Sequence, residues 1–251
     1  LREGMALYPD DRNLAEEFAD VAFWRGDTET LKARWEDIYA RFPNSQRAPR
    51  FLGGIAINER RFEDADRYLL EAIRRAPDDI QAYSVYCDSA VFRKDWNLAL
   101  TRYETMQDKF PENVTPFVGI SRCYRRLERE SEADDVLLRA KSLFASRHEW
   151  AVEMAAVLHG RGRTSEALEA WKFVRSGWPL VPDAWTEGAR ALRELDRASE
   201  GEELLAQAVE RLTNVPGVVM EYARWATVRG DHAAAVERWE LFRERFPDRP
   251  E

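Results

Sequence analysis

A column of aromatic and apolar residues recurs every 34 residues, and this period constrains the fold more strongly than any other feature of the chain. The column consists of Tyr8, Phe42, Ala76, Phe110, Phe144, Trp178, Leu212 and Phe246. Proline follows in six of these eight cases, whereas Ala145 and Thr213 replace it in the other two. A regular period of this length is typical of stacked structural repeats, which bury their apolar surfaces against one another.

The apolar spacing within one period is helical. Residues 13–25 and 28–41 of the first repeat carry apolar side chains at intervals of three or four, which places those side chains on one face of each helix. Pro43 ends the second helix because the residue before a proline is disfavoured in the α conformation. Asn44 or Ser45 can then cap the next helix. Each repeat is therefore predicted to be a helix–turn–helix, with no strands.

Two columns of small residues mark the places where helices are expected to cross closely. The first column consists of Ala19, Gly53, Cys87, Ser121, Ala155, Ala189 and Ala223. The second consists of Ala65, Ala99, Ala133, Ala167, Gly201 and Ala235, with Leu31 as the exception. A large side chain at such a crossing would overpack it, at a cost of roughly 1–3 kcal/mol.

The period, the proline and both small columns together resemble the tetratricopeptide repeat family. The large position of the family's first helix is matched by Tyr83, Phe117 and Trp185, and the aromatic position of its second helix by Trp35, Tyr103, Trp171 and Trp239. The resemblance implies an all-α, right-handed superhelical solenoid of antiparallel helix pairs, with the first helices lining a concave groove. Seven repeats are predicted, at residues 12–45, 46–79, 80–113, 114–147, 148–181, 182–215 and 216–249.

The ends of the chain and one junction depart from this regular pattern. Because Ala145 replaces the proline, the second helix of the fourth repeat is predicted to continue through residues 144–146 as one longer helix. Residues 1–11 match the end of a preceding second helix, and residues 250–251 the start of a following segment. We therefore expect the chain to be a piece of a longer protein or array.

Composition and motifs exclude several classes of function. The formal net charge of −8 argues against nucleic-acid binding, which needs a basic surface. No apolar run approaches the roughly 18 residues of a membrane-spanning helix. Cys87 and Cys123 lack metal-site spacing, and unpaired cysteines favour a cytoplasmic location. The sequence contains no catalytic constellation, metal-ligand set or nucleotide-binding loop, so a non-enzymatic protein without a cofactor or metal is predicted.

The resemblance also implies which side chains face a ligand, because the family's ligands contact fixed positions of each first helix. The basic residues at these positions are Arg47, Arg50, Arg122, Arg125, Arg126, His159, Arg190, Arg193 and Arg224. Arginine forms bidentate hydrogen bonds with carboxylates and phosphates, so these residues favour an acidic protein or peptide partner. The alternative is that the arginines pair with Glu149, Asp183, Glu187 and Glu194 on the same face.

Phe23 and Trp24 end the first helix of the first repeat and form a candidate aromatic anchor for a partner. They could equally cover the first repeat. The leading interpretation is a scaffold that holds a protein or peptide segment in its groove. One alternative is an accessory region of a larger bacterial enzyme, such as a polysaccharide glycosyltransferase or sulfotransferase. The other is an array that self-associates through its uncapped ends.

Overall fold

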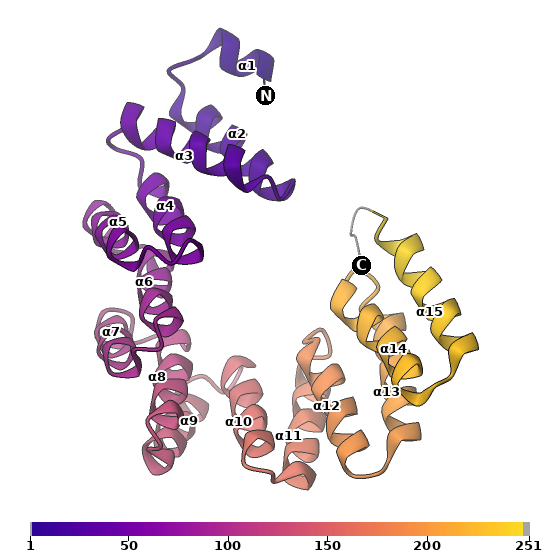
Figure 1. Ribbon diagram of the computed structural model, residues 1–251. Helices are drawn as coiled ribbons and strands as arrows, with labels where there is room; N and C mark the ends of the chain where they lie inside the picture. The colour runs from indigo at the N-terminus through magenta and orange to yellow at the C-terminus, as the bar shows by residue number, and fades with distance from the viewer. Residues whose placement is uncertain (1, 248–251) are drawn as a thin grey trace. The chain divides into compact units, whose positions relative to one another are not determined.

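The computed structural model describes residues 2–247, and these residues form fifteen α-helices and no strand (Figure 1). A short helix α1 (Arg2–Leu7) precedes seven helix pairs. The first helices are α2 (Arg12–Trp24), α4 (Arg47–Asn58), α6 (Ile80–Phe92), α8 (Thr115–Arg126), α10 (Glu149–Gly160), α12 (Asp183–Glu194) and α14 (Pro216–Arg229). The second helices are α3 (Thr28–Arg41), α5 (Phe62–Arg75), α7 (Trp96–Lys109), α9 (Glu130–Leu143), α11 (Thr164–Gly177), α13 (Ala198–Arg211) and α15 (His232–Arg245).

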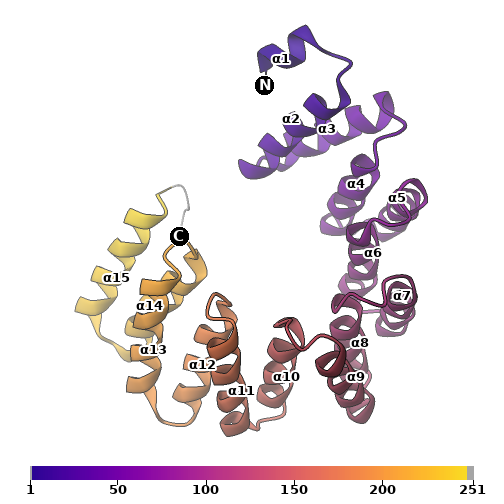
Figure 2. The same ribbon diagram turned by 180° about the vertical axis from the view of Figure 1, so that it is seen from behind.

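The start and end of every second helix repeat at intervals of 34 residues, which confirms the helix–turn–helix prediction. The chain divides into two compact units, Leu1–Val136 and Leu137–Glu251, which we call the N-terminal and C-terminal units. In the N-terminal unit α4 packs against α5 and α6 against α7, and in the C-terminal unit α12 packs against α13 (Figures 1 and 2). Each unit is thus a stack of antiparallel helix pairs, and the fold is an all-α helical solenoid.

The turn inside each repeat has one backbone conformation throughout. The residue that enters the left-handed region has φ between 59° and 74° and recurs every 34 positions, as Gly26, Arg60, Lys94, Glu128, Gly162, Asp196 and Gly230. The backbone N–H of the following residue donates a hydrogen bond to a carbonyl of the first helix, as Asp95 N does to the Ala90 carbonyl at 3.1 Å. This is the hydrogen bond of a Schellman helix end. Asp27, Asp95 and Asp231 then cap the second helix by accepting a backbone N–H.

Both columns of small residues are buried, as the sequence predicts. A Cβ atom added to Gly53 of the first column would lie 2.5 Å from Leu69 Cγ, and one added to Gly201 of the second column would lie 2.7 Å from Trp225 Cζ2. Leu31, the exception in the second column, is buried as well. The columns therefore mark true close approaches between helices.

An ion cluster joins α5, α6 and α7. The Arg102 guanidinium donates to both Asp66 carboxylate oxygens, at 3.0 and 2.6 Å, and to the Tyr86 carbonyl oxygen at 2.6 Å. Ser89 Oγ donates to Asp66 Oδ1 at 2.7 Å, and Arg93 forms a further ion pair with Asp66. The Arg102 side chain is only 6% exposed and Asp66 is 20% exposed, so this network is largely removed from water.

The same cluster recurs 136 residues later, where Glu202 pairs with Arg229 and Arg238. Arg238 also donates to the Tyr222 carbonyl, as Arg102 does to Tyr86. Between the first two repeats the charges are exchanged, because Lys32 occupies the column of Asp66 and Glu59 the column of Arg93. Lys32 Nζ lies 2.8 Å from Glu59 Oε1.

The predicted continuous helix through residues 144–146 is wrong. Helix α9 ends at Leu143, and α10 begins at Glu149. Indole donors of the C-terminal unit satisfy the carbonyls that a continuing helix would use, because Trp150 Nε1 donates to the Phe144 carbonyl at 3.0 Å and Trp178 Nε1 to the Ser146 carbonyl at 3.2 Å. Side-chain donors thus satisfy carbonyls at a helix end that lacks a proline.

The N-terminal segment forms the helix expected there, α1, which contacts α2. The predictions for Leu1 and for residues 250–251 lie outside the described residues. Within residues 2–247, every helix is too short or too polar to span a membrane.

Candidate functional site

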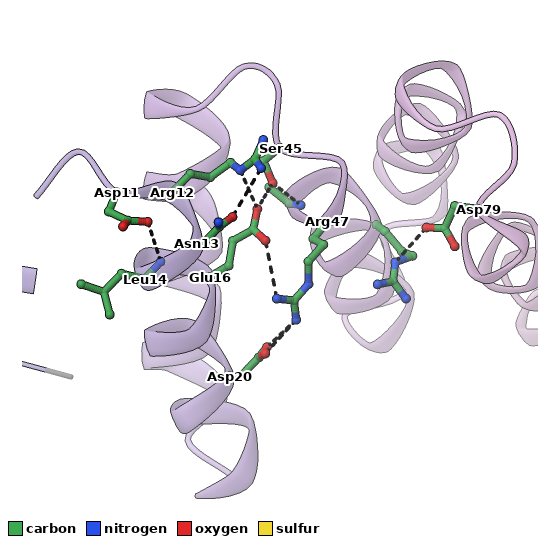
Figure 3. Close-up of polar contacts among 11 residues, drawn as sticks. Asp11, Arg12, Asn13, Leu14, Glu16, Asp20, Ser45, Arg47 and Asp79 are labelled. Atoms are coloured by element: carbon green, nitrogen blue, oxygen red, sulfur yellow. Dashed lines mark hydrogen bonds and ion pairs between the residues drawn. The ribbon is translucent and has the colours of Figure 1, made fainter. Parts of the chain in front are cut away.

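The first-helix face of the N-terminal unit begins with a charged contact between α2 and α4. Figure 3 shows the Arg47 guanidinium between two acids of α2, with Nη2 2.7 Å from Asp20 Oδ2 and Nη1 3.5 Å from Glu16 Oε2. Glu16 also accepts a hydrogen bond from Ser45 Oγ at 2.8 Å, and this hydroxyl accepts the Ala48 N–H at 3.0 Å. Arg47 therefore ties the first two repeats together, and its charge is balanced within the chain.

An apolar cleft of about 290 Å³ lies next to this contact, and we call it the Gly54 cleft. It is lined by residues of α2, α3, α4 and α6, namely Phe23, Leu31, Arg50, Phe51, Gly54, Ile55, Ile57, Asn58, Val85, Asp88 and Phe92. The Arg50 side chain is directed to other groups, because its Nε lies 3.5 Å from Asp79 Oδ2 and its Nη1 donates to Gln81 Oε1 at 3.3 Å.

Phe23 and Phe92 line the Gly54 cleft with exposed rings, and Trp24 contacts Phe23. Phe23 is 54% exposed, Phe92 is 63% exposed, and Trp24 is 81% exposed. Phe23 and Trp24 contact each other edge to face, with ring centroids 5.5 Å apart. A Cβ atom added to Gly54 would have no atom of the surrounding helices within 4 Å, so the space above this glycine is open. Of the two candidate anchor residues, Phe23 lines the cleft.

Asp88 is the acidic residue of the Gly54 cleft. Among the described residues, the hydrogen-bond donor that reaches its carboxylate is the Tyr103 hydroxyl, 3.5 Å from Oδ1. Burial raises the pKa of Asp88, although the hydrogen bond from Tyr103 and the positive charge of Arg122 oppose that shift. The structure thus holds a carboxylate with one long hydrogen bond in an apolar wall.

A second cleft, which we call the Trp96 cleft, shares Phe92 with the first and is lined by Val91, Phe92, Lys94, Trp96 and Arg126. The Arg126 guanidinium carbon lies 5.4 Å from the centroid of the Trp96 ring. Lys94 and Arg126 are exposed, and no carboxylate of the described residues forms an ion pair with either of them. Arg122 and Arg125 project from the same helix, α8.

Within residues 2–247, two of the predicted basic residues in the C-terminal unit contact acidic side chains, unlike Lys94 and Arg126 of the Trp96 cleft. His159 Nε2 lies 2.8 Å from Glu194 Oε2, and Arg190 Nη1 lies 2.8 Å from Glu187 Oε2. The Arg193 guanidinium lies over the Trp225 ring, 5.0 Å from its centroid, whereas Arg224 is exposed. These two contacts involve Glu187 and Glu194, which the alternative interpretation of the arginines proposed as partners.

Neither cysteine is placed for chemistry. Cys87 and Cys123 are both buried and unpaired. Burial raises the pKa of Cys123 to about 11 and also raises that of Cys87, so neither thiol ionises near neutral pH. Within the described part of the chain, no group of three or more His, Cys, Asp or Glu side chains is arranged to hold a metal ion.

No family model and no curated protein matches this sequence. Solved structures do match. The chain aligns over 97% of its length with 53% of yeast Tom70, with a TM-score of 0.79 and 14% identity. It aligns over 93% of its length with 93% of a tetratricopeptide repeat protein from Parabacteroides merdae, with a TM-score of 0.61 and 11% identity. A thermophilic tetratricopeptide repeat protein of Thermus thermophilus aligns fully with 73% of this chain, with a TM-score of 0.58 and 18% identity. The chain has the tetratricopeptide-repeat fold.

Several residues of the two clefts in this tetratricopeptide array were missed by sequence reasoning. Asp88 and Phe92 belong to α6 of the third repeat, for which no groove residues were predicted. Lys94 and Trp96 lie at and just after the turn that ends α6, outside the ligand positions of the first helices. Phe92 could have been found from sequence, because it occupies the same column as Trp24 and Arg126 at intervals of 34 residues.

Proposed function

We propose that this array is a non-enzymatic binding domain that holds an acidic protein or peptide segment on the first-helix face of its N-terminal unit. The observation that carries the proposal is the Trp96 cleft, where Lys94 and Arg126 lie beside an aromatic ring without an acid partner among the described residues. Two cations on an aromatic surface favour a carboxylate-bearing ligand because the charges attract it and the rings supply apolar contact area.

The balanced ion pairs elsewhere support this location. Arg47 is paired with Asp20 and Glu16, and Arg190 is paired with Glu187. A ligand carboxylate would have to displace these internal partners, whereas at the Trp96 cleft it would meet Lys94 and Arg126, which have no acid partner among residues 2–247. The proposal therefore gives the leading role to Lys94 and Arg126 and a supporting role to Arg122 and Arg125, which share helix α8 with Arg126.

A selection of randomised short peptides on the immobilised protein tests the proposal. We expect the selected peptides to be enriched in Asp and Glu. Their affinity should fall by tenfold or more, about 1.4 kcal/mol, for the double variant Lys94→Glu/Arg126→Glu. The matched control is Arg67→Glu/Arg74→Glu, which makes the same charge change on exposed positions of α5, a second helix of the same unit. Peptides without acidic enrichment, or equal binding by the reversed variant, would refute the acidic partner.

Self-association is favoured by a separate observation. Leu7 and Tyr8 at the N-terminal end and Val236 of α15 are large apolar side chains that are well exposed. Contact between such end surfaces would produce a mass that rises with protein concentration in light scattering. A constant monomer mass would argue against it.

A further inference from the structure

We infer that the Gly54 cleft binds a basic side chain of the partner segment, whose aliphatic stem packs against Phe23 and Phe92 and whose cationic group pairs with Asp88. This inference rests on the proposed function and specifies a second feature of the partner. A segment that fits both clefts carries a basic residue close to an acidic one.

The cleft is large enough to accept a long side chain. Its volume of about 290 Å³ lies at the lower limit of pockets that accept drug-sized molecules. Phe23, Ile57 and Phe92 supply an apolar wall, and the open space over Gly54 lets a chain approach the backbone of α4. Long basic side chains place their methylene groups against apolar surfaces of this kind.

The charge of the cleft selects a cation over an apolar guest. Asp88 accepts one long hydrogen bond from Tyr103, and the Arg50 side chain interacts with Asp79 and Gln81. An apolar guest would remove Asp88 further from water without a new partner, which is unfavourable for a carboxylate. A lysine or arginine guest would give it a charge-assisted hydrogen bond.

The aromatic rings add to the same preference. Phe23 and Phe92 are more than half exposed at the edge of the cleft, and a cation close to the face of an aromatic ring is attracted by its quadrupole. Burial also raises the pKa of Asp88 in the free protein, and a bound cation would reverse that effect by stabilising the ionised carboxylate.

The position of Phe92 links this guest to the acidic residue of the proposed partner. Because Phe92 lines both clefts, neighbouring side chains of one bound segment can enter the Gly54 cleft and the Trp96 cleft. The Gly54 cleft offers the carboxylate of Asp88, since its one cation, Arg50, is directed to Asp79 and Gln81, whereas the Trp96 cleft offers the cations Lys94 and Arg126. The two clefts therefore fix the direction in which a segment with adjacent opposite charges can bind.

The experiment uses the peptides selected on the full chain and compares each with a copy in which the basic residue is replaced by norleucine. On the wild-type protein this replacement should weaken binding by tenfold or more. On Asp88→Asn it should have little effect, because the partner charge is gone. Gly54→Leu should weaken all selected peptides by tenfold or more, since the new side chain fills the cleft.

The control for Gly54→Leu is Gly217→Leu, because Gly217 also lies in a first helix with no atom within 4 Å of an added Cβ. Circular dichroism checks that each variant is folded. Peptides that lack a basic residue, or that bind equally well to wild type, Asp88→Asn and Gly54→Leu, would overturn the inference. If such peptides still lose affinity for Lys94→Glu/Arg126→Glu, the proposed function stands and only the inference about the Gly54 cleft fails. If no peptide is selected, both fail.

Discussion

Removing the negative charge of Asp66 should destabilise the N-terminal unit far more than removing a neighbouring charge on the same helix. In Asp66→Asn, Arg102 stays 6% exposed but loses the carboxylate that accepts two of its hydrogen bonds. Breaking a buried ion pair by removing one partner costs about 3–5 kcal/mol, and we expect about 3 kcal/mol here because Asp66 is itself 20% exposed. Asp64→Asn removes a carboxylate of α5 that pairs with Arg61 at 2.6 Å and is 38% exposed, so it should cost less than about 1 kcal/mol.

The assay is urea unfolding followed by circular dichroism, together with hydrogen exchange of the amides in α5, α6 and α7. Hydrogen exchange is needed because a repeat array can open locally before it unfolds as a whole. The interpretation of the cluster as a buried contact between repeats would be refuted by either of two results. One is an equal decrease in the free energy of unfolding for Asp66→Asn and Asp64→Asn, and the other is a decrease below about 1 kcal/mol for Asp66→Asn.

The pH dependence provides a second check on the same cluster. Burial by itself would raise the pKa of Asp66, but the hydrogen bonds from Arg102 and Ser89 outweigh it and hold that pKa below its ordinary value of 3.8. A lowered native pKa means that the stabilisation is fully present above the unfolded-state pKa and is lost as the pH falls through the native one. The difference in the free energy of unfolding between wild type and Asp66→Asn should therefore become smaller in acid, starting near pH 3.8. A difference that stays constant below that pH would contradict the interpretation.

Three further predictions concern other parts of the fold. Gly53→Ala should lower the free energy of unfolding by roughly 1–3 kcal/mol, because the new methyl group overpacks the helix crossing. Gly54→Ala should raise it by up to about 1 kcal/mol, because alanine favours the helix and has open space there. Equal melting temperatures of the two variants would contradict this contrast. Gly230→Ala should cost about 1 kcal/mol, because its φ of 74° is unfavourable for alanine, and urea unfolding measures the loss. Cys87 and Cys123 should react with a thiol reagent at neutral pH only after unfolding, so fast labelling of the native protein would be inconsistent with their burial.

The sequence predicts the helix pairs well because their determinants are local or repeat at a fixed interval. The 34-residue period places every second helix, and the buried small columns follow from it. The junction at residues 144–146 could not be predicted in this way. Helix α9 ends there at Leu143, and Trp150 and Trp178 donate to carbonyls of the junction; such contacts depend on the orientation of side chains in other segments.

The candidate site was predicted only in outline. A repeat position identifies a side chain on the first-helix face, and Arg50 and Arg126 do line clefts there. Whether a charge on that face has an internal partner depends on side chains of the adjacent helix, as Arg47 with Asp20 shows. The partly satisfied carboxylate of Asp88 is a matter of burial, which the spacing of residues does not reveal.

The Lys32–Glu59 pair carries the opposite charges to the Asp66–Arg93 pair at the same repeat positions. This difference affects which repeats can pack against each other. Repeats of equal length and similar shape could stack on any neighbour during folding or after recombination between repeats. If the second repeat were lost, Arg93 would face Lys32 where it now faces Asp66, and two cations would meet at the joint. The signs of these charges therefore disfavour a direct joint between the first and third repeats, and a chain shortened in this way would carry a local penalty at its new junction.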